Sequence, residues 1–492
     1  MDLNNKRKVQ FLYCFVIAIL FLSIGSCCSW LYSTNSWVDS NCFFTVGKSM
    51  LKGKILYRDI YEQKGPVLYF IHAIAALISN NNFFGVFILE IIFFSGYLFF
   101  SLRLGEEYVS NAKLLYLIPP MISMIILVSR AFGMGDSAEE FSFVFVVYTL
   151  YTIIYVQHRN RTLTALEAFG IGVSAAMVLW IKYTILGFFI VMAIYIVMYT
   201  IKIDSRRLIK ICEFGLLGCV IITIPILVYF GVNHALNDLW IGYFYNNLFL
   251  YPGEVAENHL ILIARILVGV LINNKVFALF LCGGIVWVYL TGKNDRIILS
   301  FSFAGLLLGV YWGGRTYPYY ALILFVYSIF GIIAFLRCFE KIKIKKDNIW
   351  MIFGTIIMFL IVCLWGNNIP RMKIKREELP QYQFAEIINK KKKPTLLNYG
   401  FLDGGFYLAA DIVPNSKYFC TLNIPLKDMY DTQAEEIAGG KFDFIITRTE
   451  KLDEYNVEWK KYSCICSAKY VSENENMVYY LYERKDGEGR KQ

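Results

Sequence analysis

The stretch from Asp39 to Pro66 combines a carboxylate, several cations and aromatic side chains in one segment. The Lys and Arg residues that follow its first acid are Lys48, Lys52, Lys54, Arg58 and Lys64. A carboxylate can take a proton from a hydroxyl group as a general base. Arg binds phosphate through a planar fork, and Lys binds it as a point charge. The segment therefore predicts chemistry on an anionic lipid headgroup, with Asp39 as the general base.

Three residues of this segment are candidate ligands of the phosphate: Arg58, Tyr61 and Lys64. Among them, the Tyr hydroxyl would supply a neutral hydrogen-bond donor. The alternative for all three is a belt of residues at the membrane interface, where Tyr and Lys are common. For Asp39 the alternative is an acid that begins a helix and satisfies free backbone N–H groups. Taken alone, the sequence leaves these alternatives open.

A second group of acids follows a later apolar run. Asp136, Glu139 and Glu140 lie in the sequence GMGDSAEEF. Carboxylates at the entrance of a membrane span are costly to bury, which favours a position facing a wet cavity. There they would support the base or bind an acceptor sugar or a cation. The alternative is a set of acids at a helix N-terminus, each favourable by about 0.3–1 kcal/mol.

Two cations stand apart from the other basic residues. Lys182 lies in WIKYT and Arg315 in GGRTYPYY, and each is a candidate for a second phosphate contact. Lys182, Tyr317 and Tyr320 are candidates for the wall of a donor or acceptor pocket. Ordinary anchoring at the membrane interface is the alternative for these residues.

The composition is that of a membrane protein. Of the 492 residues, 57% are hydrophobic and 17% are charged, and the mean hydropathy is +0.50. A soluble domain carries about 25% charged residues. The 12 Cys and 4 His show neither a disulfide framework nor the spacing of a metal site, so no metal ligands are predicted, although a divalent cation stays possible. No basic stripe indicates a nucleic-acid partner.

Separate apolar runs of about 17–25 residues indicate helices that cross a bilayer core about 30 Å thick. Lys6, Arg7 and Lys8 precede the first run and place the N-terminus in the cytoplasm. The shorter run Pro66–Ile78 predicts a helix on the outer surface, and 231–259 predicts an outer loop. These runs predict an all-α polytopic protein of the cell membrane with about eleven spans and with its C-terminus on the outer side. The predicted spans are 9–32, 83–102, 114–130, 141–156, 166–181, 185–201, 211–230, 276–290, 297–311, 321–336 and 349–365.

The chain changes character after about Ile369, where charged residues increase and apolar runs shorten to strand length. The predicted strands are 395–399, 442–447 and 477–482, and helical patterns near 383–390 and 427–438 lie between them. This tail predicts a small extracytoplasmic α/β domain. We therefore expect a membrane domain over 1–366 and a second domain over 367–492. Asp403-Gly404-Gly405 predicts a turn, and a binding loop is the alternative interpretation.

The first-loop motif has a counterpart in a known family. The residues that carry it are Asp39, Phe43-Phe44, Gly47, Leu51, Gly53, Tyr57-Arg58-Asp59 and Lys64-Gly65-Pro66. This pattern resembles the GT-C superfamily of integral-membrane glycosyltransferases, in the bacterial branch of protein mannosyltransferases and the lipid A aminoarabinose transferase. Asp136 with Glu139-Glu140 and then Gly314-Arg315 follow this motif in the same order as in the family. The resemblance covers residues 9 to about 340. Ser40 stands where many relatives have a second acid, and Gln63 stands where some relatives have a Glu before the Lys.

The resemblance implies inverting transfer of a sugar from a polyprenyl-phosphate donor on the outer face. The acceptor would be an envelope component: a cell-wall glycan, a teichoic-type polymer, a lipid or a protein. Asp39 would deprotonate the acceptor hydroxyl, while Lys64, Arg58 and Arg315 would hold the donor phosphate. The partners would be this donor, membrane lipids and the acceptor. The alternative function is a flippase or transporter of a lipid-linked sugar.

Overall fold

The computed structural model describes residues 3–253, 258–292, 295–340, 347–472 and 475–485. The chain divides into two compact units that each combine distant parts of the sequence. The first unit consists of residues 1–31, 87–228 and 253–370, and the second of residues 32–86, 229–252 and 371–492. The segment from Asp39 to Pro66 and the polar tail therefore belong to the same unit.

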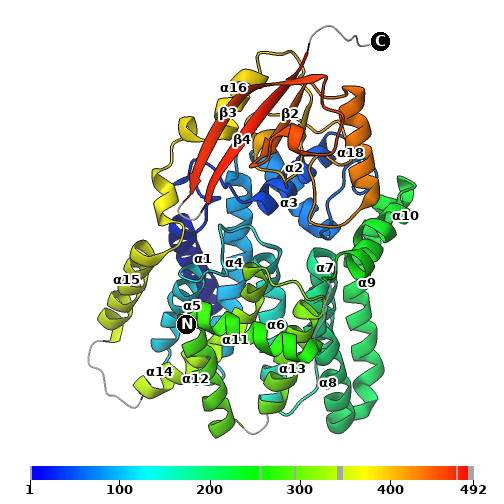
Figure 1. Cartoon of the computed structure of the whole chain (residues 1–492). Helices are drawn as coiled ribbons and strands as arrows, with labels where there is room; N and C mark the ends of the chain where they lie inside the picture. Colours follow the sequence, from blue (N-terminus) through cyan, green and yellow to red (C-terminus); the bar gives the residue numbers. More distant parts are fainter. Residues whose placement is uncertain (1–2, 254–257, 293–294, 341–346, 473–474, 486–492) are drawn as a thin grey trace. The chain divides into compact units, whose positions relative to one another are not determined.

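The first unit consists of helices joined by short connections (Figure 1). Its α-helices are α1 (Leu3–Gly25), α4 (Phe84–Gly105), α5 (Ile118–Leu127), α6 (Ala138–His158), α7 (Ala165–Lys182), α8 (Leu186–Asp204), α9 (Leu208–Val232), α11 (His259–Asn273), α12 (Lys275–Thr291), α13 (Asp295–Tyr311), α14 (Ser328–Glu340) and α15 (Asp347–Trp365). Short 3₁₀ helices extend or join them: η1 (Leu114–Leu117), η2 (Tyr183–Ile185), η3 (Ser205–Arg207), η5 (Pro318–Tyr327) and η6 (Ile369–Lys373). Every predicted span overlaps one of these helices.

Several of these helices can cross a membrane. By length and composition, 5 helical segments of the described chain qualify, or up to 6 when the bent pair α11–α12 counts as one span. One of the segments, 165–232, runs through α7, α8 and α9. Shorter apolar helices lie at 66–78, 114–127 and 349–365. The chain is a multi-pass membrane protein, and the number of about eleven spans stays a prediction.

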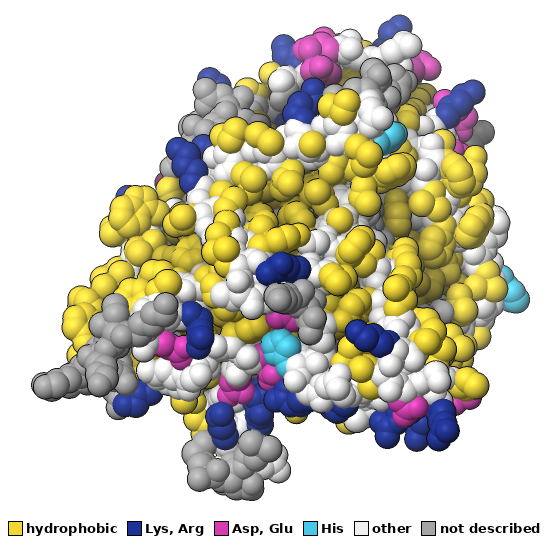
Figure 2. Space-filling model, turned by 90° about the horizontal axis from the view of Figure 1, so that it is seen from below, with side chains coloured by type: hydrophobic (Ala, Val, Ile, Leu, Met, Phe, Trp, Pro, Cys, Tyr) yellow, Lys and Arg dark blue, Asp and Glu magenta, His cyan; other side chains and the backbone are white. Residues whose placement is uncertain are grey.

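Exposed apolar side chains are numerous on the helices of the first unit. On α9, for example, Ile209, Leu216 and Ile221 are 72%, 65% and 52% exposed. Figure 2 shows hydrophobic side chains over a broad area of one face, with Lys and Arg side chains gathered along an edge. Apolar helix surfaces bordered by cations are typical of a protein whose helices face lipid, with basic residues beside the headgroups.

The second unit contains both helices and a four-stranded sheet (Figure 1). Its helices are α2 (Val38–Leu51), α3 (Pro66–Ile78), α10 (Leu236–Leu239), the π-helix η4 (Trp240–Leu250), η7 (Arg376–Glu378), α16 (Pro380–Ile388), α17 (Phe406–Ala409), α18 (Lys427–Gly439) and η8 (Leu452–Glu454). Its strands are β1 (Leu396–Asn398), β2 (Phe444–Arg448), β3 (Tyr462–Ser472) and β4 (Glu475–Arg484). The strand order is β1-β2-β4-β3, with β1 and β2 parallel and the other pairs antiparallel.

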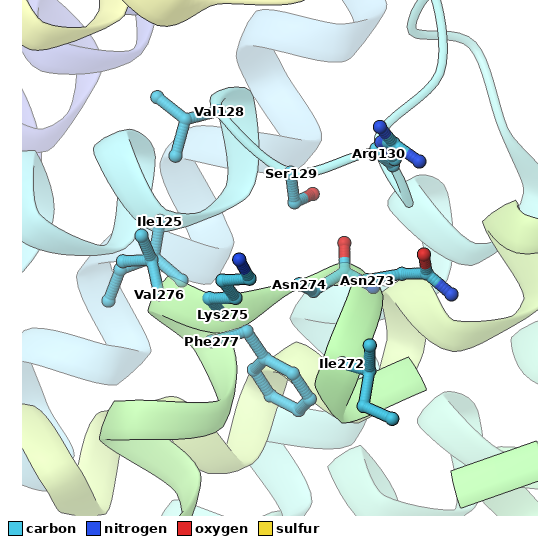
Figure 3. A pocket seen from close by; sticks show the side chains of 10 residues that line it. All are labelled: Ile125, Val128, Ser129, Arg130, Ile272, Asn273, Asn274, Lys275, Val276 and Phe277. Carbon is cyan, nitrogen blue, oxygen red and sulfur yellow. The ribbon is translucent and has the colours of Figure 1, made fainter. Parts of the chain in front are cut away.

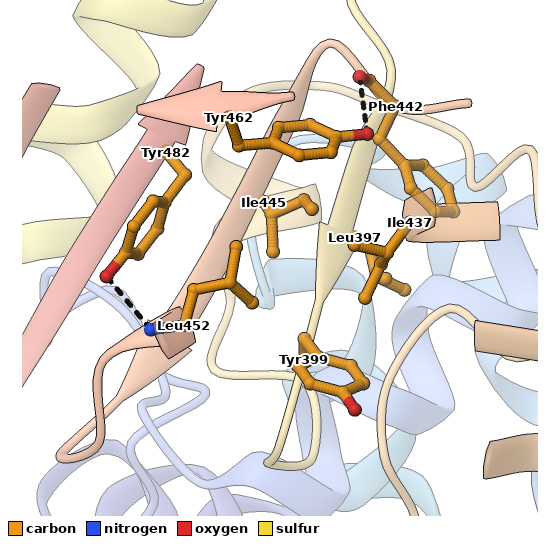
Figure 4. Packing of buried hydrophobic residues seen from close by; sticks show 8 residues of the cluster. All are labelled: Leu397, Tyr399, Ile437, Phe442, Ile445, Leu452, Tyr462 and Tyr482. Atoms are coloured by element: carbon orange, nitrogen blue, oxygen red, sulfur yellow. Dashed lines mark hydrogen bonds between the residues drawn. The ribbon is translucent and has the colours of Figure 1, made fainter. Parts of the chain in front are cut away.

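One side of this sheet carries an apolar core (Figure 4). In the register of the sheet, Ile445 of β2 lies beside Leu397 of β1 and Tyr482 of β4. Side chains from α18 and the neighbouring loops complete the cluster, in which the Tyr482 hydroxyl accepts a hydrogen bond from Leu452 N–H (2.9 Å). The small α/β fold expected for the tail is confirmed. Strand β3 was not predicted, because polar residues interrupt its sequence.

The segment predicted as a long outer loop between spans, 231–259, is largely helical; its place on the outer side stays a prediction. Its described part contains α10 and the π-helix η4. Gly242 lies so close to the Tyr57 ring that a Cβ atom there would be 2.8 Å from it. The buried residues of η4 are Gly242, Tyr243, Asn246 and Asn247, whereas Trp240, Tyr245 and Phe249 are exposed.

Helices α2 and α3 pack closely through a glycine of the first-loop motif. A Cβ atom at Gly47 would lie 2.6 Å from Ala73 N and 2.7 Å from His72 C. Gly53, another glycine of the motif, has φ +86°, a conformation that favours glycine. Both glycines therefore have a structural reason to occur at these positions.

Replacing Gly47 with Ala should destabilise the second unit by about 1–3 kcal/mol, because the added methyl group forces α2 away from α3. Thermal unfolding of the purified protein measures this change. Gly439→Ala on α18 is the matched control, since a Cβ atom there meets nothing within 4 Å. Equal unfolding temperatures for the two variants would contradict the account.

The tail holds α2 through hydrogen bonds to a buried acid. Asp403 Oδ2 accepts from the Thr45 hydroxyl (2.6 Å), while Oδ1 accepts from Gly405 N–H (2.9 Å) and Asn398 Nδ2 (3.1 Å). Burial raises the pKa of Asp403 from 3.8 to about 6, although these hydrogen bonds oppose the rise. Gly405 has φ +91° at the start of α17, so the sequence DGG makes the turn that positions this acid.

The pKa of Asp403 makes the stability of the second unit pH-dependent. The folded chain keeps a proton on Asp403 that the unfolded chain loses, so stability should fall as the pH rises from about 4 to about 6. A pKa increase of this size corresponds to about 3 kcal/mol. Asp403→Asn removes the charge: its Oδ1 can accept from Gly405 and Asn398, and its Nδ2 can donate to the Thr45 hydroxyl. Its gain in unfolding temperature should be larger at about pH 7.5 than at about pH 4.5; the same gain at both pH values would refute this role.

Candidate active site

Asp39 occupies the first turn of α2. The residue before the helix, Trp37, is extended and provides no side-chain cap. The carboxylate of Asp39 is half-buried. A carboxylate in this position interacts favourably with the helix dipole, which agrees with the alternative of a helix N-terminal acid. This position does not exclude proton transfer, because the side chain retains contact with solvent.

Lys64 lies against the same face of α2 as Asp39. Its Nζ atom is 5.5 Å from the ring centroid of Phe43, and its side chain is only 11% exposed. Phe43 follows Asp39 by four residues, and side chains four apart lie on one face of a helix. The fold of the second unit therefore gives one face of α2 both the candidate base and a cation.

An acid that the sequence analysis did not identify accompanies this cation. Glu62 Oε1 lies 3.6 Å from Lys64 Nζ, and Glu62 Oε2 accepts from the Lys64 backbone N–H (3.0 Å). Tyr69 also donates its hydroxyl hydrogen to Glu62. Burial and then the charge of Glu62 raise the pKa of Tyr69 well above its usual range, which keeps this donor protonated. Gln63 therefore does not leave Lys64 without an acidic neighbour, because Glu62 takes that place.

The other two phosphate candidates of this segment have contacts of their own. Arg58 is exposed; it donates to Asn233 O (2.7 Å) and to Asp59 Oδ1 (3.2 Å). The buried Tyr61 hydroxyl donates to Gly242 O (3.4 Å) and accepts from Asn246 Nδ2 (2.9 Å). Burial raises the pKa of Tyr61. To bind a phosphate, either side chain would have to exchange contacts that the structure shows.

In the first unit, buried acids gather around Asp136. Its backbone adopts φ +65°, and its N–H donates to Glu90 Oε1 (2.8 Å) and Glu140 Oε2 (3.0 Å). Ser26 Oγ donates to the Glu90 carboxylate (2.8 Å to Oε2). Glu140 Oε1 has no hydrogen-bond partner among the described residues. Glu90, which lies within an apolar run, was not among the predicted site residues; a charge in mid-span was the available signal.

A second cluster of the first unit joins Glu139, Lys182 and aromatic rings. Lys182 and Glu139 form a buried ion pair, with side chains 6% and 1% exposed. Lys182 Nζ also lies 3.5 Å from the ring centroid of Tyr320, whose ring is 5.5 Å from that of Tyr317. The structure thus brings together four of the predicted residues. Arg315 is half-buried and follows Gly314, which has φ +75°.

The described residues contain no group of three or more His, Cys, Asp or Glu side chains arranged to hold a metal ion. The buried carboxylates near Asp136 are bonded to backbone N–H and hydroxyl groups instead. Any use of a divalent cation stays a prediction.

Comparison with known proteins identifies the fold. No protein-family model matches the chain, and no curated protein shows significant sequence similarity to it. Among solved structures, it is similar to ArnT from Cupriavidus metallidurans bound to undecaprenyl phosphate, with a TM-score of 0.58 and 10% identity. The match covers 96% of this chain and 97% of that one. The chain therefore shares the overall fold of this ArnT structure.

Proposed function

We propose that the chain is an inverting glycosyltransferase that uses a polyprenyl-phosphate-linked sugar as its donor. Its acceptor would be an envelope glycan, polymer, lipid or protein on the outer membrane face. Support comes from the fold shared with ArnT, whose structure holds undecaprenyl phosphate. The observation that carries the proposal is that Lys64 lies against Phe43, on the face of α2 that also carries Asp39.

In this proposal Asp39 accepts the proton of the acceptor hydroxyl. The hydroxyl oxygen forms a bond to the anomeric carbon as the bond from that carbon to the phosphate oxygen breaks. The electron pair of the broken bond leaves with the polyprenyl phosphate, and a single displacement inverts the anomeric centre. Lys64 stabilises the charge that develops on the leaving phosphate.

Glu62 would act as a positioning residue for Lys64. Its carboxylate holds the backbone N–H of Lys64 and lies near the ammonium group, and Tyr69 fixes the carboxylate. A cation held in place before substrate binds loses less side-chain entropy on binding phosphate. Arg58, Tyr61 and Arg315 stay predicted phosphate ligands, and the other candidates of the first unit stay predicted acceptor or pocket residues.

Replacing Lys64 with Met should slow sugar transfer by about 10–100-fold, which corresponds to one hydrogen bond to a charged group. The loss should appear mainly as a higher KM for the donor if the phosphate contact is already made in the bound ground state. Lys52→Met is the control, since Lys52 is an exposed cation of the same loop. A loss of equal size in both variants would argue against a specific role of Lys64.

The experiment that tests the function compares lipid extracts and envelope glycans from an intact strain and a deletion strain by mass spectrometry. The deletion should remove one sugar from the envelope and let its polyprenyl-phosphate donor accumulate. If the protein is a flippase, the purified protein in vesicles would instead move the donor across the membrane without transferring its sugar. Unchanged glycans and unchanged donor levels in the deletion strain would overturn the proposal.

A further inference from the structure

The first unit contains a pocket at the break between α11 and α12. The two helices meet at Asn274 with their axes bent by 116°. A pocket of about 420 Å³ lies between this break and the end of α5 (Figure 3). It is lined by Ile125, Val128, Ser129, Arg130, Ile272, Asn273, Asn274, Lys275, Val276 and Phe277. This volume is in the usual range of small-ligand sites.

Two adjacent amides satisfy the end of α11 and leave the start of α12 uncapped. Asn273 Nδ2 donates to Gly269 O (2.8 Å), and Asn274 Nδ2 donates to Val270 O (2.9 Å). These bonds occupy carbonyl groups at the C-terminus of α11. No side chain caps α12, whose first residue, Lys275, lines the pocket. The positive end of the α12 dipole is therefore available to an anion at this place.

A buried acceptor gives independent evidence of a missing ligand. Asn274 is 8% exposed, and its Oδ1 atom has no hydrogen-bond partner among the described residues. Its side chain extends toward Ser129, which lies in the loop that follows α5 (Figure 3). An unsatisfied buried oxygen costs free energy, so a ligand with a hydroxyl or another donor would stabilise this site.

Charge decides which kind of ligand fits. Arg130 and Lys275 both line the pocket and are exposed, and neither has a hydrogen bond or ion pair with a described residue. The described residues that line the pocket include no carboxylate. Apolar side chains such as Ile125, Ile272 and Phe277 form its remaining walls. Two free cations, a helix N-terminus and one acceptor match a phosphate that carries a hydroxyl group.

We propose that this pocket binds a phosphate that carries a hydroxyl group, either as the headgroup of an anionic lipid or as free phosphate. Arg130 and Lys275 bind the phosphate oxygens, and Asn274 Oδ1 accepts from the hydroxyl group. None of the residues that line this pocket is among the proposed donor contacts, which are Arg58, Tyr61, Lys64 and Arg315. The apolar walls favour a lipid, whose glycerol backbone and acyl chains would lie along them.

The test uses the full chain purified in detergent. Native mass spectrometry compares retention of phosphatidylglycerol with that of phosphatidylcholine, which lacks the headgroup hydroxyls and the net negative charge. Phosphatidylglycerol should be retained preferentially. In a second arm, inorganic phosphate is titrated against the lipid: displacement identifies phosphate itself as sufficient, and no displacement identifies the lipid headgroup as the ligand.

Two variants make the assignment specific. The double variant Arg130→Gln with Lys275→Gln should reduce retention by about tenfold or more, since two charged contacts are lost. Asn274→Asp places a carboxylate against the phosphate and should have a similar effect; because it also loses the donor to Val270 O, its folding is checked by thermal unfolding. Lys210→Gln, which removes an exposed cation of α9, should retain the lipid normally. The proposal is overturned if phosphatidylglycerol and phosphatidylcholine are retained equally, or if correctly folded variants keep the preference.

Discussion

Replacing Asp39 with Asn is expected to lower the rate of sugar transfer by about 10²–10⁴-fold, the usual contribution of a general base. Asn has nearly the same size and can stand in the first turn of α2 as Asp does. Losing the interaction of the carboxylate with the helix dipole should cost only about 0.3–1 kcal/mol. The variant should therefore fold normally and fail in the chemical step. The assay is transfer from the lipid-linked donor by protein reconstituted in vesicles, with kcat and KM measured separately.

The control for this prediction removes a carboxylate elsewhere in the same unit. Asp431 on α18 is exposed, so Asp431→Asn changes the net charge equally. It should leave the rate unchanged. If Asp39→Asn keeps kcat but loses thermal stability, the residue has the structural role of a helix N-terminal acid. That outcome would remove Asp39 as the base.

The second large effect concerns the buried ion pair of Lys182 and Glu139. Replacing Lys182 with Met leaves the Glu139 carboxylate buried without its cation, and should destabilise the first unit by about 3–5 kcal/mol. The cost is this large because both side chains are almost fully buried, so water cannot stabilise the Glu139 charge that is left. Thermal unfolding in detergent, together with the yield of folded protein, measures the loss.

A double variant separates this electrostatic cost from lost packing. Lys182→Met with Glu139→Gln removes both charges and should recover most of the stability, since no isolated charge remains. If the double variant is as unstable as Lys182→Met alone, the ion pair does not explain the loss. Lys182 was predicted as a pocket residue, and a drop in transfer by the stable double variant would support that additional role.

The positions of the helices were predictable because long apolar runs leave few alternatives in a membrane protein. The predicted surface helix Pro66–Ile78 has the same bounds as α3. Polar and aromatic segments gave weaker signals. The π-helix Trp240–Leu250 lies in a segment that was predicted as a loop; its buried residues, Gly242, Tyr243, Asn246 and Asn247, form no apolar run that would predict a helix. Strand β3 was missed because many of its side chains are at least partly exposed and its polar residues break the apolar run.

Parts of the candidate site were visible in the sequence, and others depend on folding. Glu62 and Lys64 are two residues apart in a non-helical segment, a spacing that places side chains on one side and could have indicated their pairing. The contact between Thr45 and Asp403 joins residues 358 positions apart. No local pattern predicts such a contact. It shows that the tail supports the helix that carries Asp39, a role that its sequence did not reveal.

The most direct test of the account compares envelope glycans by mass spectrometry in three strains. One strain is intact, one lacks the protein, and one carries Asp39→Asn at the normal protein level. We predict that the deletion and Asp39→Asn lose the same sugar, whose mass then identifies the group transferred. If Asp39→Asn keeps the sugar that the deletion loses, Asp39 is not the base, and the central claim is contradicted.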